Sequence, residues 1–86
     1  MTSYSVEFTT AAARELKKLE PPAARKKILE KIRELKDDPR PAGCRKIVGE
    51  KNAWRLRVGD YRVLYEVDDQ VVTVTVFRIA HRREAY

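Results

Sequence analysis

One segment of this chain constrains its fold more than any other, because it combines a strict two-residue alternation with a turn signal. Apolar and basic side chains alternate in WRLRV at positions 54–58, Gly59-Asp60 follows, and YRVLY at positions 61–65 continues the pattern. Such alternation is typical of half-buried strands, and a Gly-X pair suits a two-residue type II′ turn. The segment therefore predicts a β-hairpin in which Val58 opposes Tyr61.

The predicted hairpin has one apolar face and one basic face. The apolar face carries Trp54, Leu56, Val58, Tyr61, Val63 and Tyr65, of which Trp54 and Tyr65 are expected in the core. On the other face Arg57 opposes Arg62, and Arg55 lies beside them. Facing like charges destabilise a strand pair by a few tenths to roughly 1 kcal/mol, so stability does not explain these arginines. A ligand with several negative charges does, and phosphate fits the planar, permanently charged guanidinium group.

The sequence before the hairpin predicts a strand, two helices and a further strand. YSVEF at positions 4–8 alternates like a strand, and Thr9 or Thr10 can cap the helix that follows. Pro21-Pro22 ends this helix and begins the next, since proline is tolerated in a first turn. The helices carry apolar stripes at helical spacing: Ala12, Leu16 and Leu19, then Ala24, Ile28, Ile32 and Leu35. A strand is expected at 45–48, followed by a turn at 49–52.

The last predicted strand covers residues 71–79, and its register depends on the loop before it. A three-residue loop directs Thr73, Thr75, Phe77 and Ile79 to the Trp54 face, whereas a four-residue loop directs Val72, Val74 and Val76 there. We expect the four-residue loop, because it gives the helices a more apolar surface to cover. The predicted fold is α+β: one small domain over residues 1–86, with an antiparallel sheet and a helical hairpin packed on one face.

Composition limits the possible functions. Eighty-six residues, 43% of them hydrophobic and 37% charged, suit one soluble domain with a single core. The net charge of +6 favours an acidic partner. One cysteine and one histidine predict no disulfide, metal or other cofactor. Neither a leader pattern nor an apolar run of membrane-spanning length is present, so we expect no membrane association and a cytoplasmic location.

The C-terminal sequence HRREAY, positions 81–86, is expected to join the arginine face. The last strand runs antiparallel to the one that carries Arg62, so its end returns toward the Gly59-Asp60 turn. His81, Arg82 and Tyr86 would then lie near the arginines. Cations combined with groups that can move protons suit phosphoryl transfer on RNA.

The segments AWRLRVGDYRVLYEVDD (53–69) and VTVFRIAHRREAY (74–86), with a strand and two helices before them, resemble the RelE/ParE superfamily of toxins from toxin-antitoxin pairs. The resemblance covers nearly the whole chain and is nearer to the RelE branch, whose members enter the ribosomal A site and cleave mRNA. It implies a RelE-like fold and a metal-independent endoribonuclease. The site residues that it implies are Arg55, Arg57, Arg62, Arg82 and Tyr86.

The sequence departs from the RelE pattern at the two strand positions before the turn. The best-known RelE proteins have lysine there, whereas this chain has Arg55 and Arg57. Arginine does not deprotonate in proteins, so neither residue can act as a base. The base that takes the proton of the attacking 2′-hydroxyl would be Tyr86, His81 or a group on the ribosome. The products would be a 2′,3′-cyclic phosphate and a free 5′-hydroxyl.

The resemblance also implies partners, namely the ribosome with its mRNA and a cognate antitoxin that contributes an acidic, amphipathic segment. Two other functions stay open at this point. A toxin of the same fold could act on a protein such as gyrase, as ParE toxins do. A basic module of this kind could also bind nucleic acid without cutting it, with a strong dependence on salt.

Overall fold

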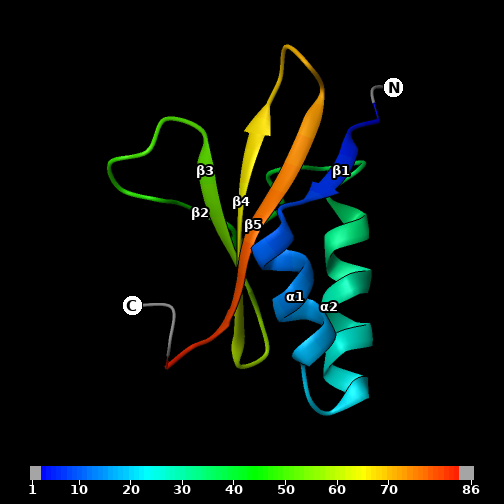
Figure 1. The fold of residues 1–86 in the computed structure, drawn as a ribbon. Helices are drawn as coiled ribbons and strands as arrows, with labels where there is room; N and C mark the ends of the chain where they lie inside the picture. The colour runs from blue at the N-terminus through cyan, green and yellow to red at the C-terminus, as the bar shows by residue number, and fades with distance from the viewer. Residues whose placement is uncertain (1–2, 84–86) are drawn as a thin grey trace.

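The structure is a computed structural model that describes residues 3–83 (Figure 1). Its elements, in chain order, are β1 (Ser5–Phe8), α1 (Thr10–Lys18), α2 (Pro22–Glu34), β2 (Arg45–Lys46), β3 (Ala53–Val58), β4 (Tyr61–Asp68) and β5 (Thr73–His81). The strands form one sheet in the order β1-β5-β4-β3-β2. Figure 1 shows α1 and α2 side by side on one face of that sheet. The predicted α+β architecture is therefore confirmed.

The helices begin where the sequence predicts. The Thr9 hydroxyl caps α1 by accepting a hydrogen bond from the backbone N–H of Ala12, at 3.2 Å. Pro21 and Pro22 separate the two helices, and Pro22 occupies the first turn of α2. Within residues 3–83, neither helix is long and apolar enough to cross a membrane.

The sheet is antiparallel except at one edge, where β1 pairs with β5 in parallel, from Ser5 opposite Thr73 to Phe8 opposite Val76. The sequence predicts an antiparallel sheet, and this single parallel pair was not foreseen. A parallel pair needs a long connection between its strands. The chain between β1 and β5 contains both helices and three other strands, so the two ends of the domain meet at this edge.

The register of β5 combines the two alternatives. Asp68 pairs with Thr73, which leaves the four-residue loop 69–72, and Val74 and Val76 are buried as expected. A bulge then separates the pair Tyr65–Val76 from the pair Leu64–Arg78 and inserts Phe77 between them. The bulge reverses the alternation, so Ile79 is buried as well.

Two predicted strand ends are wrong. Val71 and Val72 were expected in the last strand, but both lie in the loop. Val72 has φ of +54°, a left-handed conformation that is incompatible with an extended strand. Residues 45–48 were also expected to form a strand. β2 instead stops at Lys46. The N–H of Ile47 still donates to the Ala53 carbonyl, and the N–H of Glu50 then donates to the Ile47 carbonyl, which turns the chain.

The core lies between the helices and the covered face of the sheet. Its largest fully buried side chains are Tyr65, Ile28, Ile32, Leu35, Val63, Val67, Val74 and Val76. Tyr65 is in the core as predicted, and its hydroxyl donates to the Pro39 carbonyl at 2.8 Å. Trp54 was also expected there. It is only half-buried, because its position near the sheet edge leaves part of the ring to be covered by Arg40.

Candidate functional site

The face of the sheet that the helices leave open carries a group of arginines at the β3–β4 end. Arg57 and Arg62 are direct partners, as the sequence predicts, and Arg55 precedes Arg57 by two residues on the same face. Gly59 has φ of +59°, as the first central position of a type II′ turn requires. The tight turn thus holds two like charges opposite each other.

A fourth arginine completes this group. Arg45 of β2 pairs with Arg55 across the sheet edge. These four arginines and Gly43 line a hollow of about 240 Å³, which we call the arginine hollow, and among residues 3–83 no carboxylate lines it. Arg45 was missed as a site residue because a two-residue strand gives no pattern from which its register can be read.

The chemistry of the arginine hollow is that of an anion site. Guanidinium groups donate several hydrogen bonds in a fixed plane and match phosphate oxygens in pairs. A hollow lined by four of them can hold a phosphodiester and stabilise extra negative charge on it. Arginine supplies no base, so proton transfer needs another group.

Arg82 lies beside the β3–β4 turn, near the position that the sequence predicts. Its backbone N–H donates to the Asp60 carbonyl at 2.7 Å, and its guanidinium group is 3.9 Å from the Asp60 carboxylate. Alternation beyond β5 places Arg82 on the same side as Ala80, which pairs with Arg62. Tyr86, the other predicted tail residue, lies outside the described residues.

His81 is not brought together with the arginines, which corrects the expected cluster. It pairs with Tyr61, whose side chain lies on the helix face, and their rings meet edge to face with centroids 5.3 Å apart. Both rings line a different hollow, of about 370 Å³, against Lys27 and Ile28 of α2. The physical reason is the bulge, which puts Ala80 opposite Arg62 and His81 opposite Tyr61, on the helix face.

The imidazole has a local partner at the start of the tail. The backbone N–H of Arg83 donates to His81 Nδ1 at 3.3 Å. A side chain that accepts from the N–H two residues later forms the same ring as an Asx turn. His81 is therefore built into the turn by which the chain leaves β5.

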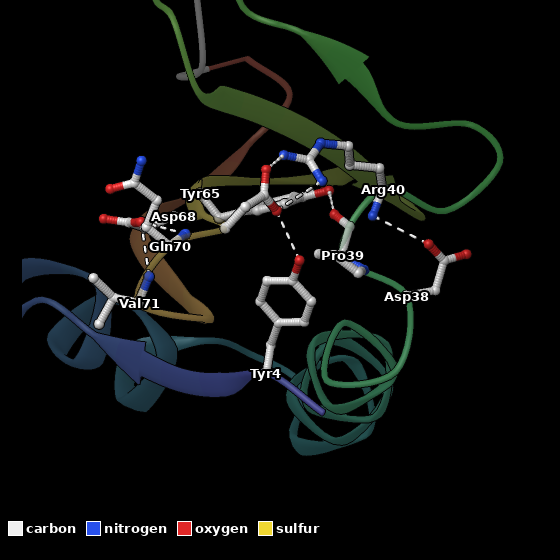
Figure 2. A network of polar contacts seen from close by, with 9 residues as sticks. Tyr4, Asp38, Pro39, Arg40, Tyr65, Asp68, Gln70 and Val71 are labelled. Carbon is white, nitrogen blue, oxygen red and sulfur yellow. Dashed lines mark hydrogen bonds and ion pairs between the residues drawn. The ribbon is translucent and has the colours of Figure 1, made fainter. Parts of the chain in front are cut away.

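A separate polar group joins three distant segments at the other end of the sheet (Figure 2). The Asp69 carboxylate accepts from the Tyr4 hydroxyl at 2.7 Å and from both terminal nitrogens of Arg40, at 3.3 and 2.9 Å. The Arg40 guanidinium also lies over the Trp54 ring, 5.4 Å from its centroid. We call this group, Tyr4, Arg40, Trp54 and Asp69, the Arg40 clamp. It was missed because Tyr4, Arg40 and Asp69 are far apart in the sequence and lie outside the helices and strands, where no local pattern relates them.

The Arg40 clamp changes the titration of its members. The Arg40 guanidinium, helped by the Tyr4 hydroxyl, holds the pKa of the Asp69 carboxyl below its usual value. The hydrogen bond to Asp69 in turn raises the pKa of Tyr4 and that of Arg40. In the core nearby, burial raises the pKa of the Tyr65 hydroxyl.

Comparison with known proteins finds toxins of toxin-antitoxin pairs. A family model of the ParE toxin of the type II toxin-antitoxin system parDE matches residues 6–86. Toxin RelG of Mycobacterium tuberculosis is 36% identical over 86 residues, covering 96% of this chain and 95% of RelG.

Solved structures agree in fold. The RelBE2 toxin-antitoxin complex of Mycobacterium tuberculosis contains a chain with a TM-score of 0.81 and 35% identity, covering 94% of this chain and 100% of that one. The archaeal RelE-RelB complex of Pyrococcus horikoshii contains a chain with a TM-score of 0.83 and 27% identity, covering 98% of this chain and 100% of that one. The RelE-like fold expected from the sequence is therefore confirmed.

Proposed function

This chain belongs to the RelE/ParE superfamily and is a toxin of a type II toxin-antitoxin system, and from that premise we propose that it is a ribosome-dependent mRNA endonuclease of RelE type. The observation that carries the proposal is the arginine hollow. Four guanidinium groups line it on the face of the sheet that the helices leave open. Such an arrangement is costly for stability and suits a phosphodiester.

In the proposed reaction the arginine hollow holds one phosphodiester of the mRNA. The ribose 2′-hydroxyl attacks the adjacent phosphorus and loses its proton, and the bond from phosphorus to the 5′-oxygen breaks. The leaving 5′-oxygen takes a proton, which gives a 2′,3′-cyclic phosphate and a free 5′-hydroxyl. Arg55, Arg57 and Arg62 stabilise the charge that develops on the phosphate oxygens, and Arg82 assists from the β3–β4 turn.

The proton is removed by a group outside the arginine hollow. His81 lies on the opposite face and accepts from the Arg83 N–H, and in this proposal its imidazole supports the turn after β5 and is not the base. Tyr86 is the residue of this chain proposed for proton transfer or for stacking on a base, and a ribosomal group is the other source.

The antitoxin is the second proposed partner. The RelBE2 and Pyrococcus horikoshii structures are complexes of such toxins with antitoxins. A cognate antitoxin of this chain would bring an acidic, amphipathic segment to the basic surface, with affinity that falls steeply as salt is added.

Single-turnover cleavage of mRNA on programmed ribosomes tests the proposed nuclease activity. Arg57→Ala should lower the rate by roughly 10²- to 10³-fold, the usual effect of removing one donor to a developing anion. Arg33→Ala is the matched control, since it removes an exposed arginine of α2, a helix on the covered face of the sheet. Equal rates for the two variants, or products without a cyclic phosphate, would refute the mechanism.

The same assay separates the candidate bases. Removal of Tyr86 should slow cleavage by roughly 10²- to 10⁴-fold if this residue moves the proton. His81→Ala should lower the cleavage rate by less than about tenfold. His81→Asn should restore the rate, because an asparagine carbonyl accepts from the Arg83 N–H as Nδ1 does. Comparable large losses in both His81 variants would make the imidazole the base.

One observation favours a second function. The matching family model carries the ParE name, and ParE-like toxins that act on gyrase are the alternative already raised by the sequence. A purified protein that inhibits gyrase and leaves ribosome-bound mRNA intact would select this alternative.

A further inference from the structure

The open face of the sheet is divided into rows of opposite charge. In an antiparallel sheet, directly paired residues on one face form rows that run across the strands. Two rows at the β3–β4 turn end hold the cations: Arg57 and Arg62 with Ala80, then Arg45, Arg55, Leu64 and Arg78. Arg78, at the edge of this group, also lies 3.9 Å from Glu15 of α1.

The next two rows carry only carboxylates, hydroxyls and one small apolar residue. They are Ala53, Glu66, Thr75 and Glu7, followed by Asp68, Thr73 and Ser5. A second hollow, of about 250 Å³, lies here and includes Glu66, Asp68, Thr73 and Thr75 in its lining. Arginine rows and carboxylate rows thus occupy opposite ends of the same face, and the two hollows share no residue.

The two halves are close enough to act on one ligand. Arg62 and Glu66 are four residues apart on β4, which corresponds to about 13 Å, and the adjoining rows are about 7 Å apart. The Debye length at physiological salt is about 8 Å, so a phosphate on the inner arginine row lies within range of Glu66. A phosphate placed one row further would lie directly over carboxylates.

We propose that the carboxylate rows form a boundary that keeps the RNA backbone off the far half of the face. This inference rests on the proposed function, because it takes RNA as the ligand. The RNA backbone is attracted along the arginine rows and repelled by Glu66 and Glu7, so it crosses the sheet from β2 toward β5. The same charges oppose a path along β3 and β4. Glu66 and Glu7 are thereby specificity-determining residues that limit the number of nucleotides bound.

Glu66 is the residue through which to test the boundary. It is exposed, whereas the Asp68 carboxylate accepts from the N–H groups of Gln70 and Val71 and so supports the loop. Glu66→Lys reverses one charge of the boundary. Glu30→Lys makes the same charge change at an exposed position of α2, away from the open face.

The experiment measures binding of uridine oligomers of increasing length to the full chain, over a range of salt concentrations. Glu66→Lys should bind long oligomers several-fold more tightly. Its slope of log affinity against log salt should steepen by about 0.7 for each added phosphate contact. Its affinity should also keep rising at oligomer lengths where the wild type has levelled off. Glu30→Lys should keep the wild-type slope and length limit.

The outcomes separate this inference from the proposed function. If Glu66→Lys behaves like Glu30→Lys while Arg57→Ala weakens binding, RNA lies in the arginine hollow but the carboxylate rows set no boundary. If Arg57→Ala binds RNA as well as the wild type, the proposed function itself fails. Thermal melting of each variant confirms that the fold is retained.

Discussion

Arg40 and Arg57 lie on the same small domain and are used in opposite ways. Arg40 meets a carboxylate and an aromatic ring, and it ties the chain after α2 to the β4–β5 loop. Arg57 faces Arg62 across the strand pair and lines the arginine hollow with three other arginines. The comparison teaches that the partner, not the residue type, tells a structural arginine from a binding one.

The two groups also differ in what they do to stability. In the Arg40 clamp, charged side chains form hydrogen bonds that connect segments far apart in the chain, from Tyr4 to Asp69. The arginine hollow brings like charges together, and like charges that face each other on paired strands lower the stability of the fold. Removing an arginine should therefore have opposite consequences at the two places.

The largest expected effect comes from the arginine hollow. The double change Arg57→Ala and Arg62→Ala should abolish growth inhibition in cells, because it removes two charge-stabilising groups from the proposed reaction. Its free energy of unfolding should equal or slightly exceed that of the wild type, since a repulsive pair is gone. Urea denaturation measures the latter. A loss of more than about 2 kcal/mol would show that these arginines support the fold.

Arg40→Ala should give the reverse result, with a smaller effect. It leaves the Asp69 carboxylate and the Trp54 ring without their guanidinium partner, so the melting temperature should fall by a few degrees. Cleavage on ribosomes should stay within about twofold of the wild type, because Arg40 is not among the residues that line the arginine hollow. A cleavage defect as large as that of Arg57→Ala, at unchanged stability, would break the distinction between the two groups.

Features of the fold and the site that depend on a local sequence pattern could be predicted, and those without such a pattern could not. The β3–β4 hairpin was readable, because alternation and a Gly-X turn are local, and with it the pairing of Arg57 with Arg62. The bulge at Phe77 was not, because a bulge leaves no mark in the alternation that precedes it. Without that extra residue Ile79 would oppose Arg62, and His81 would lie on the arginine face. The bulge puts Ala80 opposite Arg62 and places His81 on the helix face instead.

Pairings between residues far apart in the sequence were not predicted, for a different reason. Arg45 joins the arginine hollow through a strand of two residues, and the Arg40 clamp depends on loops that meet only after the sheet forms. The parallel pairing of β1 with β5 belongs to the same class. Local patterns fix the elements, whereas these contacts depend on how the whole chain packs.

The smallest expected effect is the acid sensitivity that the Arg40 clamp contributes. The pKa of Asp69 is lowered in the folded protein by Arg40 and Tyr4, so its carboxylate stabilises the fold above the unfolded pKa of about 4. That contribution is lost as the pH falls through the lower, folded pKa. Asp69→Asn removes it, so this variant should be less stable than the wild type at pH 7, and the difference should shrink toward pH 3. The double variant at Arg57 and Arg62 leaves Asp69 and its partners intact and is the matched control, because it should keep the wild-type contribution of Asp69. Urea denaturation between pH 3 and 7 measures the three proteins. A wild-type advantage over Asp69→Asn that stays constant down to pH 3 would show that the Asp69 charge does not hold the clamp together.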